Sequence, residues 1–393
     1  MTEMPTTSWP RTIPMKGMII SMDDFIGFCN LKRQYNNHRD DFLHAIDLVC
    51  GKAAFIDGEF VKSFESEFAK FCQVSYVSCV NSGTNAILLA MLAMGIKAGD
   101  EVIIPANTFV ATAWGPLYAG AKPVFVDCAS DTWEIDPGKI EEAISGKTKA
   151  IIGVHLYGLP FDIDAVKEVA ENNNLMVVED CAQAHGTLYK SRPVGGLCDI
   201  GAFSFYPTKN LGAFGEGGCV TTNNARYAEQ INMLKNHAAD EYGDHEKIGF
   251  NMRMDGIQAA VLSYKLQYLE SLNQRRTEIA KRYMTEIFNP YIKMQKTPGV
   301  SGHVYHLFVI TVAQREKFMI HLHEKNIECA VHYRVPCHLQ KVFGYLGYKP
   351  GDLPNAEYLA EHCVSLPMYP ELFDEEVDRI IDACNSFNGG SEF

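Results

Sequence analysis

The chain has 393 residues, of which 47% are hydrophobic and 21% are charged. These proportions are typical of a folded soluble protein with a large core, and they exclude disordered and fibrous proteins. The formal net charge of −13 disfavours any partner bound through neutralised phosphates, so no nucleic-acid partner is expected.

The two ends of the chain show no pattern of regular structure. Residues 1–20 carry Thr, Pro and Ser without periodicity, so we expect a flexible arm, and residues 388–393 are expected to form a disordered tail. The stretch Met1–Met15 lacks the apolar block of a signal peptide, and no apolar run is long enough to cross a bilayer. We therefore expect a cytoplasmic protein without a membrane partner.

From residue 58 onward, apolar residues recur at helix and strand spacing in alternation. Phe60, Phe64, Phe68 and Phe71 predict a helix over Val61–Phe71. The next predicted elements are strand Tyr76–Val80, helix Thr84–Met94, strand Glu101–Pro105, helix Thr112–Ala119, strands Pro123–Asp127 and Ala150–Val154, helix Asp164–Glu171, and strands Leu175–Val178, Gly201–Tyr206 and Gly217–Thr222. This alternation predicts an α/β fold with a parallel sheet covered on both faces and with ligands at the carboxyl ends of its strands.

The rest of the chain predicts a smaller α+β domain. A long helical stretch runs over Gly256–Met284 and is followed by strand His306–Val312, helix Glu316–Lys325, strand Cys329–Tyr333 and helix Glu375–Cys384. We place the large domain at residues 21–275 and the small domain at 276–387.

The twelve cysteines are scattered and include no C-x-x-C pair. This excludes zinc-ribbon and thioredoxin-type motifs, so the cysteines are expected to be buried small hydrophobes in a reducing compartment. No other cluster has the spacing of metal ligands, and no metal is expected.

Three polar motifs follow predicted strands. Asn81-Ser82-Gly83-Thr84 combines a tight turn with the start of a helix, which attracts an anion, although an ordinary capped helix has the same pattern. The strand that ends at Asp180 provides a carboxylate. This carboxylate either pairs with a ring nitrogen or caps the next helix. Lys209, in a glycine-flanked loop after a strand, is either a solvated lysine or a desolvated, nucleophilic amine.

Together the three motifs suit one cofactor. Pyridoxal phosphate (PLP) needs an anion pocket, a carboxylate for its pyridinium nitrogen and a lysine for the Schiff base. The chain provides a phosphate-binding turn, then Asp180, then Lys209. The combination is more specific than any of its parts.

Long motifs over residues 28–387 resemble those of the DegT/DnrJ/EryC1/StrS sugar-nucleotide aminotransferases. The matching runs are N-S-G-T-N-A (81–86), P-A-N-T-F-V-A-T (105–112), V-F-V-D (124–127), V-H-L-Y-G (154–158), E-D-C-A-Q-A-H-G (179–186), S-F-Y-P-T-K-N-L-G (204–212), G-E-G-G (215–218) and G-F-N-M-R-M-D-G-I-Q-A-A (249–260). The resemblance implies the fold-type-I architecture of PLP-dependent transferases.

The same resemblance implies a role for each matching residue. Lys209 would carry the cofactor and shuttle the proton, Asp180 would pair with the ring nitrogen, and Gln183 would lie beside the ring hydroxyl. The other cofactor contacts are phosphate ligands Gly83, Thr84 and Ser204, the stacking residue Phe109, and Asn251, which would reach the cofactor phosphate of a neighbouring subunit. A homodimer with the active site at its interface follows.

The resemblance also narrows the reaction. Family members that act as sugar 3-dehydratases carry histidine at the position of Lys209, so transamination is expected, with L-glutamate as donor. Four runs, V-H-L-Y-G, A-Q-A-H-G, S-F-Y-P-x-K-N-L-G and Val331–Gln340, are similar to members that aminate C-3 of dTDP-3-keto-6-deoxyhexoses. This similarity implies His185, Tyr206 and His332 as substrate contacts, with buried structural roles as the alternative. Leu159 and Arg334 depart from these members and leave the preferred sugar open.

Several alternatives remain at this stage. One is a C-4 aminotransferase acting on a 4-keto-6-deoxy sugar nucleotide, and others are a non-catalytic PLP-binding regulator and a cysteine desulfurase. Basic residues would have to bind the anionic nucleotide, and the candidates are Lys32, Arg33, Arg253 and Arg334.

Overall fold

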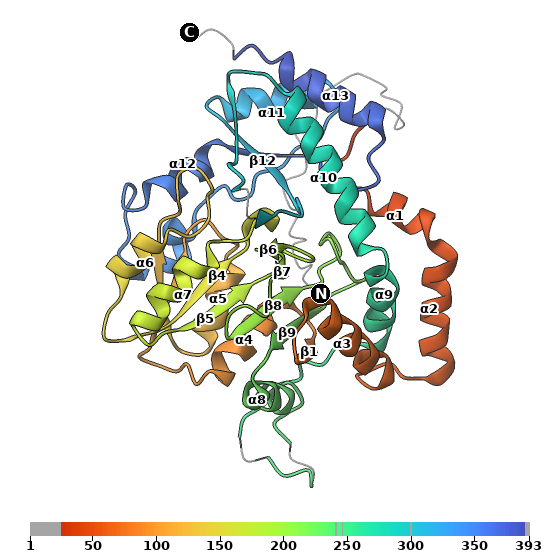
Figure 1. Ribbon diagram of the computed structural model, residues 1–393, viewed down its shortest axis with the longest axis vertical. Helices are drawn as coiled ribbons and strands as arrows, with labels where there is room; N and C mark the ends of the chain where they lie inside the picture. Colours follow the sequence, from red (N-terminus) through yellow and green to blue (C-terminus); the bar gives the residue numbers. More distant parts are fainter. Residues whose placement is uncertain (1–24, 240–241, 246, 299–300, 390–393) are drawn as a thin grey trace, which may run out of the picture.

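A seven-stranded sheet with the order β1-β9-β8-β5-β4-β2-β3 forms the centre of the molecule (Figure 1). This computed structural model describes residues 25–239, 242–245, 247–298 and 301–389, so the predicted arm (1–20) and most of the predicted tail (388–393) lie outside the described residues. Strand β9 runs antiparallel to β1 and β8, and the other neighbouring pairs are parallel. The strands are β1 (Tyr76–Val80), β2 (Glu101–Pro105), β3 (Lys122–Val126), β4 (Thr148–Val154), β5 (Met176–Asp180), β8 (Ile200–Ser204) and β9 (Gly218–Thr222).

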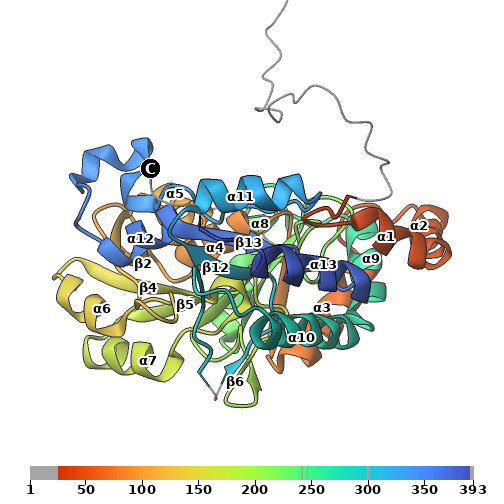
Figure 2. The same ribbon diagram turned by 90° about the horizontal axis from the view of Figure 1, so that it is seen from above.

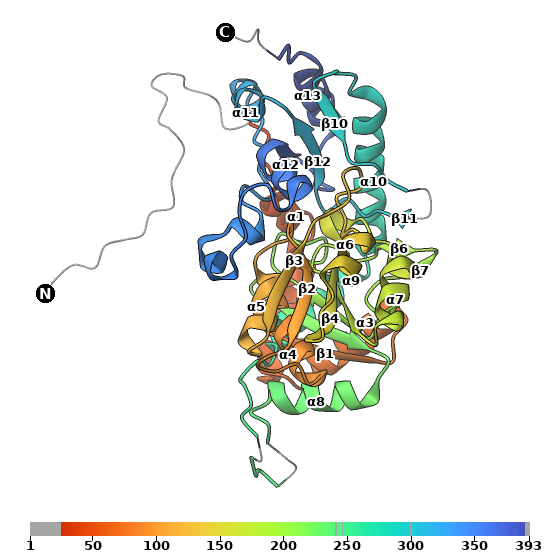
Figure 3. The same cartoon turned by 90° about the vertical axis from the view of Figure 1, so that its left-hand side faces the viewer.

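Successive strand residues point to opposite faces of this sheet, and each face has its own core. Ile151 and Val177 belong to one apolar cluster, whereas Ile152 and Val178 belong to the other. The first face packs on α3 (Glu59–Cys72), α7 (Ile163–Asn172) and α9 (Gly256–Leu266), and the second on α4 (Gly83–Ala93), α5 (Ala111–Tyr118) and α8 (Ala225–Lys235). Figure 3 shows α5 and α7 on opposite sides of β2 and β4. By the same alternation, Asp180 belongs to the face covered by α4 and α5.

The C-terminal part has a small antiparallel sheet of its own, with strand order β10-β12-β13. Its strands are β10 (Ile292–Met294), β12 (Phe308–Val312) and β13 (Cys363–Leu366). Helices α10 (Leu269–Glu286), α11 (Arg315–Glu324) and α13 (Asp374–Asn385) contribute to the core around this sheet. Figures 1 and 2 show this part lying over the large sheet, at the end opposite α8.

Shorter elements connect and border the two parts. Helices α1 and α2 lie at one side of the molecule and α6 at the other (Figure 1). Their bounds and those of the remaining elements are α1 (Leu31–Asn37), α2 (Arg39–Lys52), α6 (Pro137–Ala143), η2 (Leu156–Gly158), η3 (Cys337–Leu339), η4 (Lys341–Leu346), α12 (Pro354–His362), β6 (Leu188–Tyr189), β7 (Arg192–Pro193) and β11 (Ser301–Gly302).

The predicted fold class, a large mostly parallel sheet flanked by helices with a smaller C-terminal α+β part, is confirmed. The predicted division after residue 275 falls inside helix α10 and stays a prediction. Among the described residues, no helix is both long and apolar enough to cross a membrane. Most cysteines are buried free thiols, while Cys29 and Cys50 are exposed.

Two predicted elements are wrong. The helical stretch Gly256–Met284 is two helices, because the chain turns at Gln267–Tyr268. At this turn the centroid of the Tyr268 ring lies 5.2 Å from that of the His38 ring. The predicted strand Cys329–Tyr333 does not form, because the segment lies alongside β13 at one residue and then leaves the small sheet. That segment makes a single bridge, Ala330 to Ser365, and then turns toward the large sheet.

Candidate active site

A cavity of about 430 Å³ lies where the carboxyl ends of β1, β2, β4, β5 and β8 meet the C-terminal part. Parallel strands bring residues from distant motifs to one edge in this way. The lining residues are Ser82, Gly83, Thr84, Ile87, Thr108, Phe109, Ala111, Thr112, Val154, Asp180, Ala182, Gln183, Ser204, Tyr206, Lys209, Glu216, His332 and Tyr333.

One end of the cavity is built for an anion. Ser82 caps helix α4 by accepting a hydrogen bond from the backbone N–H of Asn85 (3.2 Å), and Gly83 and Thr84 begin the helix. A Cβ on Gly83 would lie 2.6 Å from the Cβ of Ser204, so the helix end and the end of β8 are in close contact. The free N–H groups of a helix start favour negative charge, and the Thr84 and Ser204 hydroxyls lie beside them.

This close contact leads to a first prediction. Gly83→Ala should weaken PLP binding by roughly 10-fold or more, because overpacking of this size costs about 1–3 kcal/mol and would displace the helix N–H groups. Fluorescence titration of the apo-protein measures the affinity. Gly51→Ala is the matched control, since a Cβ there meets nothing within 4 Å. Equal affinity in the Gly83 variant and wild type would contradict the prediction.

A buried carboxylate, Asp180, lies in the cavity wall. The Thr112 hydroxyl donates to its Oδ2 (2.8 Å) and the Ala182 N–H to its Oδ1 (3.1 Å). Thr108 forms a further hydroxyl pair with Thr112 (2.8 Å). Burial raises the pKa of Asp180, and the two donors and the Lys209 charge oppose that rise. The carboxylate is therefore held in one orientation, and a cationic partner would stabilise its charged form.

Lys209 is the cation that lines the same cavity. Its backbone N–H donates to the Tyr206 carbonyl (2.9 Å), which closes a tight turn after β8. Among the described residues, its ammonium has no hydrogen-bond acceptor and no ion-pair partner. Burial lowers the pKa of Lys209 to about 8, and the Asp180 charge limits the decrease. A lysine in this state provides a neutral amine near physiological pH.

Both polar atoms of the Gln183 side-chain amide form hydrogen bonds. Its Oε1 accepts from the Tyr157 N–H (2.5 Å), and its Nε2 donates to the Tyr333 hydroxyl (3.0 Å). The Tyr333 ring lies 5.5 Å from the half-exposed Phe109 ring, centroid to centroid. His332 bonds Ser365 through its Nδ1 (2.9 Å), and burial lowers its pKa to about 4. The segment after residue 329 thus brings His332 and Tyr333 into the cavity instead of forming a strand.

Two of the predicted site residues do not line the cavity. His185 is fully buried between the rings of Phe203 and Phe205, and burial lowers its pKa to about 3. His185 is not among the described residues that line the cavity, so its contact with the substrate stays a prediction. Asn251 is exposed and accepts a hydrogen bond from Arg253 (2.9 Å), outside the cavity of its own chain.

The four basic candidates lie elsewhere too. Arg33 forms two hydrogen bonds with Glu376 (2.7 Å each), and Arg334 pairs with Glu316 (3.1 Å). Lys32 and Arg253 are not among the lining residues. Within the described residues, Lys209 is the one lysine or arginine that lines the cavity, and Asp180 and Glu216 are its acids.

Sequence reasoning assigned no role to Thr112, Thr108 or Tyr333. The two threonines belong to the P-A-N-T-F-V-A-T run, and their four-residue spacing is the signal that could have placed both beside one ligand. Tyr333 reaches Gln183 across 150 positions in the sequence, which no local pattern reveals.

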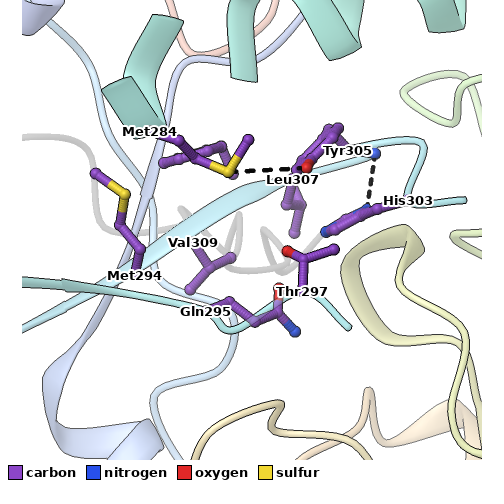
Figure 4. A pocket seen from close by; sticks show the side chains of 9 residues that line it. Met284, Met294, Gln295, Thr297, His303, Tyr305, Leu307 and Val309 are labelled. Carbon is purple, nitrogen blue, oxygen red and sulfur yellow. Dashed lines mark hydrogen bonds between the residues drawn. The ribbon is translucent and has the colours of Figure 1, made fainter. Parts of the chain in front are cut away.

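Two other features resemble a site but lack its chemistry. Burial also lowers the pKa of Lys265 to about 8, but its ammonium donates to the Gly212 carbonyl (2.7 Å) and does not line the cavity. A hollow of about 10 Å³ in the C-terminal part, shown in Figure 4, is lined mainly by apolar residues. There the Tyr305 N–H donates to His303 Nδ1, and the Tyr305 hydroxyl contacts the Met284 sulfur.

The cavity residues suit PLP. Gly83 allows the start of α4 to lie against Ser204, the Lys209 amine lacks a partner among the described residues, and Asp180 is a buried carboxylate lining the same cavity. These are the anion site, the amine and the nitrogen partner that this cofactor requires.

Comparisons with known proteins agree with this chemistry. The model of the DegT/DnrJ/EryC1/StrS aminotransferase family matches residues 36–385. The chain is 42% identical over 367 residues to the dTDP-3-amino-3,6-dideoxy-alpha-D-galactopyranose transaminase of Aneurinibacillus thermoaerophilus, covering 92% of this chain and 99% of the relative.

Two solved structures are similar over almost the whole chain. The crystal structure of S. venezuelae DesV in complex with a ketimine intermediate has a TM-score of 0.90 and 39% identity, covering 92% of this chain and 98% of that one. The structure of NtdA from Bacillus subtilis with bound cofactor PMP has a TM-score of 0.86 and 32% identity, covering 94% and 86%.

Proposed function

The chain belongs to the DegT/DnrJ/EryC1/StrS aminotransferase family, and on that premise we propose that it transfers the amino group of L-glutamate to the C-3 keto group of a dTDP-3-keto-6-deoxyhexose. It is a PLP-dependent sugar aminotransferase. The transaminase assignment rests on one observation, which is that one cavity contains Lys209, Asp180 and the N-terminus of α4. The name of the Aneurinibacillus relative supports C-3 as the site of amination. The product is a 3-amino-3,6-dideoxy sugar for a surface polysaccharide, such as lipopolysaccharide O-antigen, or for a natural product.

Lys209 has two tasks in this reaction. When bound, the cofactor supplies an electron sink and carries the amino group from donor to acceptor. Lys209 would hold the cofactor covalently at rest. Once freed, its amine would take the proton from Cα of glutamate and, in the second half-reaction, deliver a proton to C-3 of the sugar. Its pKa of about 8 suits both transfers near neutral pH.

The other site residues hold and orient the cofactor and the substrate. Asp180 would accept a hydrogen bond from the protonated ring nitrogen, while the Thr112 hydroxyl holds the carboxylate in place. Gly83, Thr84 and Ser204 would bind the phosphate at the start of α4. Phe109 would cover one face of the ring, and Gln183 would contact the ring hydroxyl. His332 and Tyr206, which also line the cavity, would contact the sugar.

The working unit in this proposal is a homodimer. The anionic donor and sugar nucleotide need more positive charge or N–H donors than one chain's cavity provides, since Lys209 is its one lining lysine or arginine in the part that the structure describes. Asn251 is exposed, and the adjoining Met252 carbonyl accepts from the Asn81 N–H (3.1 Å). This position beside the phosphate-binding turn suits contact with a second copy.

A visible absorbance titration tests the reaction and its regiochemistry. L-Glutamate should bleach the band of the bound cofactor, and a dTDP-3-keto-6-deoxyhexose should restore it, whereas the 4-keto isomer should not. Restoration by the 4-keto isomer alone would overturn C-3 amination and favour the C-4 alternative. Bound cofactor without turnover on any donor and keto sugar would favour the regulator.

A further inference from the structure

Asn210, the residue after the candidate cofactor lysine, has a buried side chain whose amide groups are all hydrogen-bonded. The Asn210 Nδ2 donates to Asn273 Oδ1 (2.9 Å) and to the Val304 carbonyl (3.2 Å), and 7% of the residue is exposed. Its Oδ1 lies 3.1 Å from His306 Nδ1. Because an amide oxygen only accepts, His306 carries its proton on Nδ1 in this contact. Asn210 therefore uses both donors and its acceptor within the fold.

The partner Asn273, on helix α10, binds a second loop of the site. Its Nδ2 donates to the His185 carbonyl (2.8 Å). A Cβ on Gly186 would lie 2.7 Å from the same nitrogen, so the loop packs directly on the amide. His185 and Gly186 end the segment that begins with Asp180 and Gln183. The two asparagines thus connect the loop that carries Lys209 with the loop that follows Asp180 at the end of β5.

This connection matters because the Lys209 side chain does not anchor itself. Its ammonium has no acceptor among the described residues, and the turn bond to Tyr206 fixes only its backbone N–H. The next anchor along the chain is the Asn210 side chain. We propose that Asn210 is a positioning residue that, through Asn273, sets the place of the Lys209 amine relative to Asp180. The inference rests on the proposed function of Lys209 as the cofactor lysine.

The test measures covalent attachment of PLP to the apo-protein. The lysine amine condenses with the cofactor aldehyde and releases one water, and borohydride reduction fixes the link as a secondary amine. A displacement of about 1 Å can slow such a reaction by as much as about 100-fold, so we expect attachment at saturating PLP to be at least about 10-fold slower in Asn210→Ala. Affinity for pyridoxamine phosphate, which makes no covalent link, should change by less than about twofold.

Asn289→Ala is the matched control. Asn289 is also buried, and its amide donates to two backbone carbonyls, those of Cys384 (2.7 Å) and Phe387 (2.6 Å), remote from the cavity. This variant should attach PLP at the wild-type rate. Asn273→Ala should slow attachment as Asn210→Ala does, and the double variant should be no slower than the slower single one, because the two act as one unit.

The outcomes separate this inference from the function on which it rests. Attachment in Asn210→Ala and Asn273→Ala at the rate of Asn289→Ala would overturn it. If Asn210→Ala does not fold, Asn273→Ala carries the test, since it leaves the other two bonds of Asn210 intact. If PLP cannot be trapped on Lys209 of the wild type, the proposed function itself fails.

Discussion

Lys209→Ala should lower transamination by at least about 1,000-fold, since it removes both the covalent anchor of the cofactor and the amine that moves the proton. Stopped-flow absorbance with L-glutamate measures the first half-reaction directly. Bound PLP should remain detectable after filtration, because the phosphate-binding turn and Asp180 are intact. Bleaching by glutamate at a rate within tenfold of wild type would contradict the role of Lys209.

The pH dependence of PLP attachment provides a second readout for the same lysine. The amine attacks only when neutral, so attachment to the apo-protein should rise with pH and level off above the lysine pKa. Burial lowers that pKa to about 8, which places the half-maximal rate near pH 8. About one-tenth of the amine is then free at pH 7, against less than about one-thousandth for an ordinary lysine.

Lys265→Met is the control for this experiment. Burial lowers the pKa of Lys265 to about 8 as well, but its ammonium is bonded to the Gly212 carbonyl and does not line the cavity. The variant should lose stability and keep PLP attachment. This result would show that a lysine with a lowered pKa but no access to the cavity does not contribute to PLP attachment.

Asp180→Asn should reduce turnover by about 100- to 1,000-fold, the usual loss when one preorganised electrostatic partner is removed. The neutral amide cannot stabilise a protonated ring nitrogen, so the cofactor loses capacity as an electron sink. PLP attachment should persist, while bleaching by glutamate becomes slow. Asp127→Asn is the control, because Asp127 is buried but, in the part of the chain that the structure describes, accepts hydrogen bonds from backbone N–H groups outside the cavity.

The same variant also tests the coupling between the two charges. The Asp180 carboxylate raises the pKa of Lys209 against the effect of burial. Removing it should therefore move the midpoint of PLP attachment below the wild-type value near pH 8. A midpoint that moves upward, or turnover within threefold of wild type, would contradict the proposed pairing.

The large sheet could be predicted from the sequence because buried parallel strands are nearly continuous apolar runs. Tyr76–Val80 and Glu101–Pro105 match the observed strands residue for residue. Helix α2 was not predicted, since only Phe42 and Val49 of its residues are buried and its pattern is correspondingly weak. The prediction of a strand over Cys329–Tyr333 is wrong because Cys329 and Val331 pack against two different apolar clusters while His332 and Tyr333 line the cavity, and these contacts depend on the tertiary fold.

The candidate site also has a part that local sequence patterns predict and a part that depends on tertiary contacts. Gly83, Asp180 and Lys209 each follow a predicted strand, so the sequence placed them at one edge of the sheet, and they line one cavity. The links between them come from tertiary contacts, such as Thr112 to Asp180 and Asn273 to His185, which join residues 68 and 88 positions apart. The roles of His185 and Asn251 stay predictions, since neither side chain reaches this cavity in a single chain.

The two sides of the cavity differ in how freely they can change. Asp180 and Gln183, which would meet the cofactor, are buried and held by hydrogen bonds, and Gly83 lies in close contact with Ser204. Tyr206 and Glu216 also line the cavity, but they are exposed, and neither side chain has a hydrogen-bond partner among the described residues. Mutational tolerance is therefore concentrated where the sugar would lie. A scaffold of this kind can acquire a new substrate through a few replacements on one side while the catalytic apparatus is inherited unchanged.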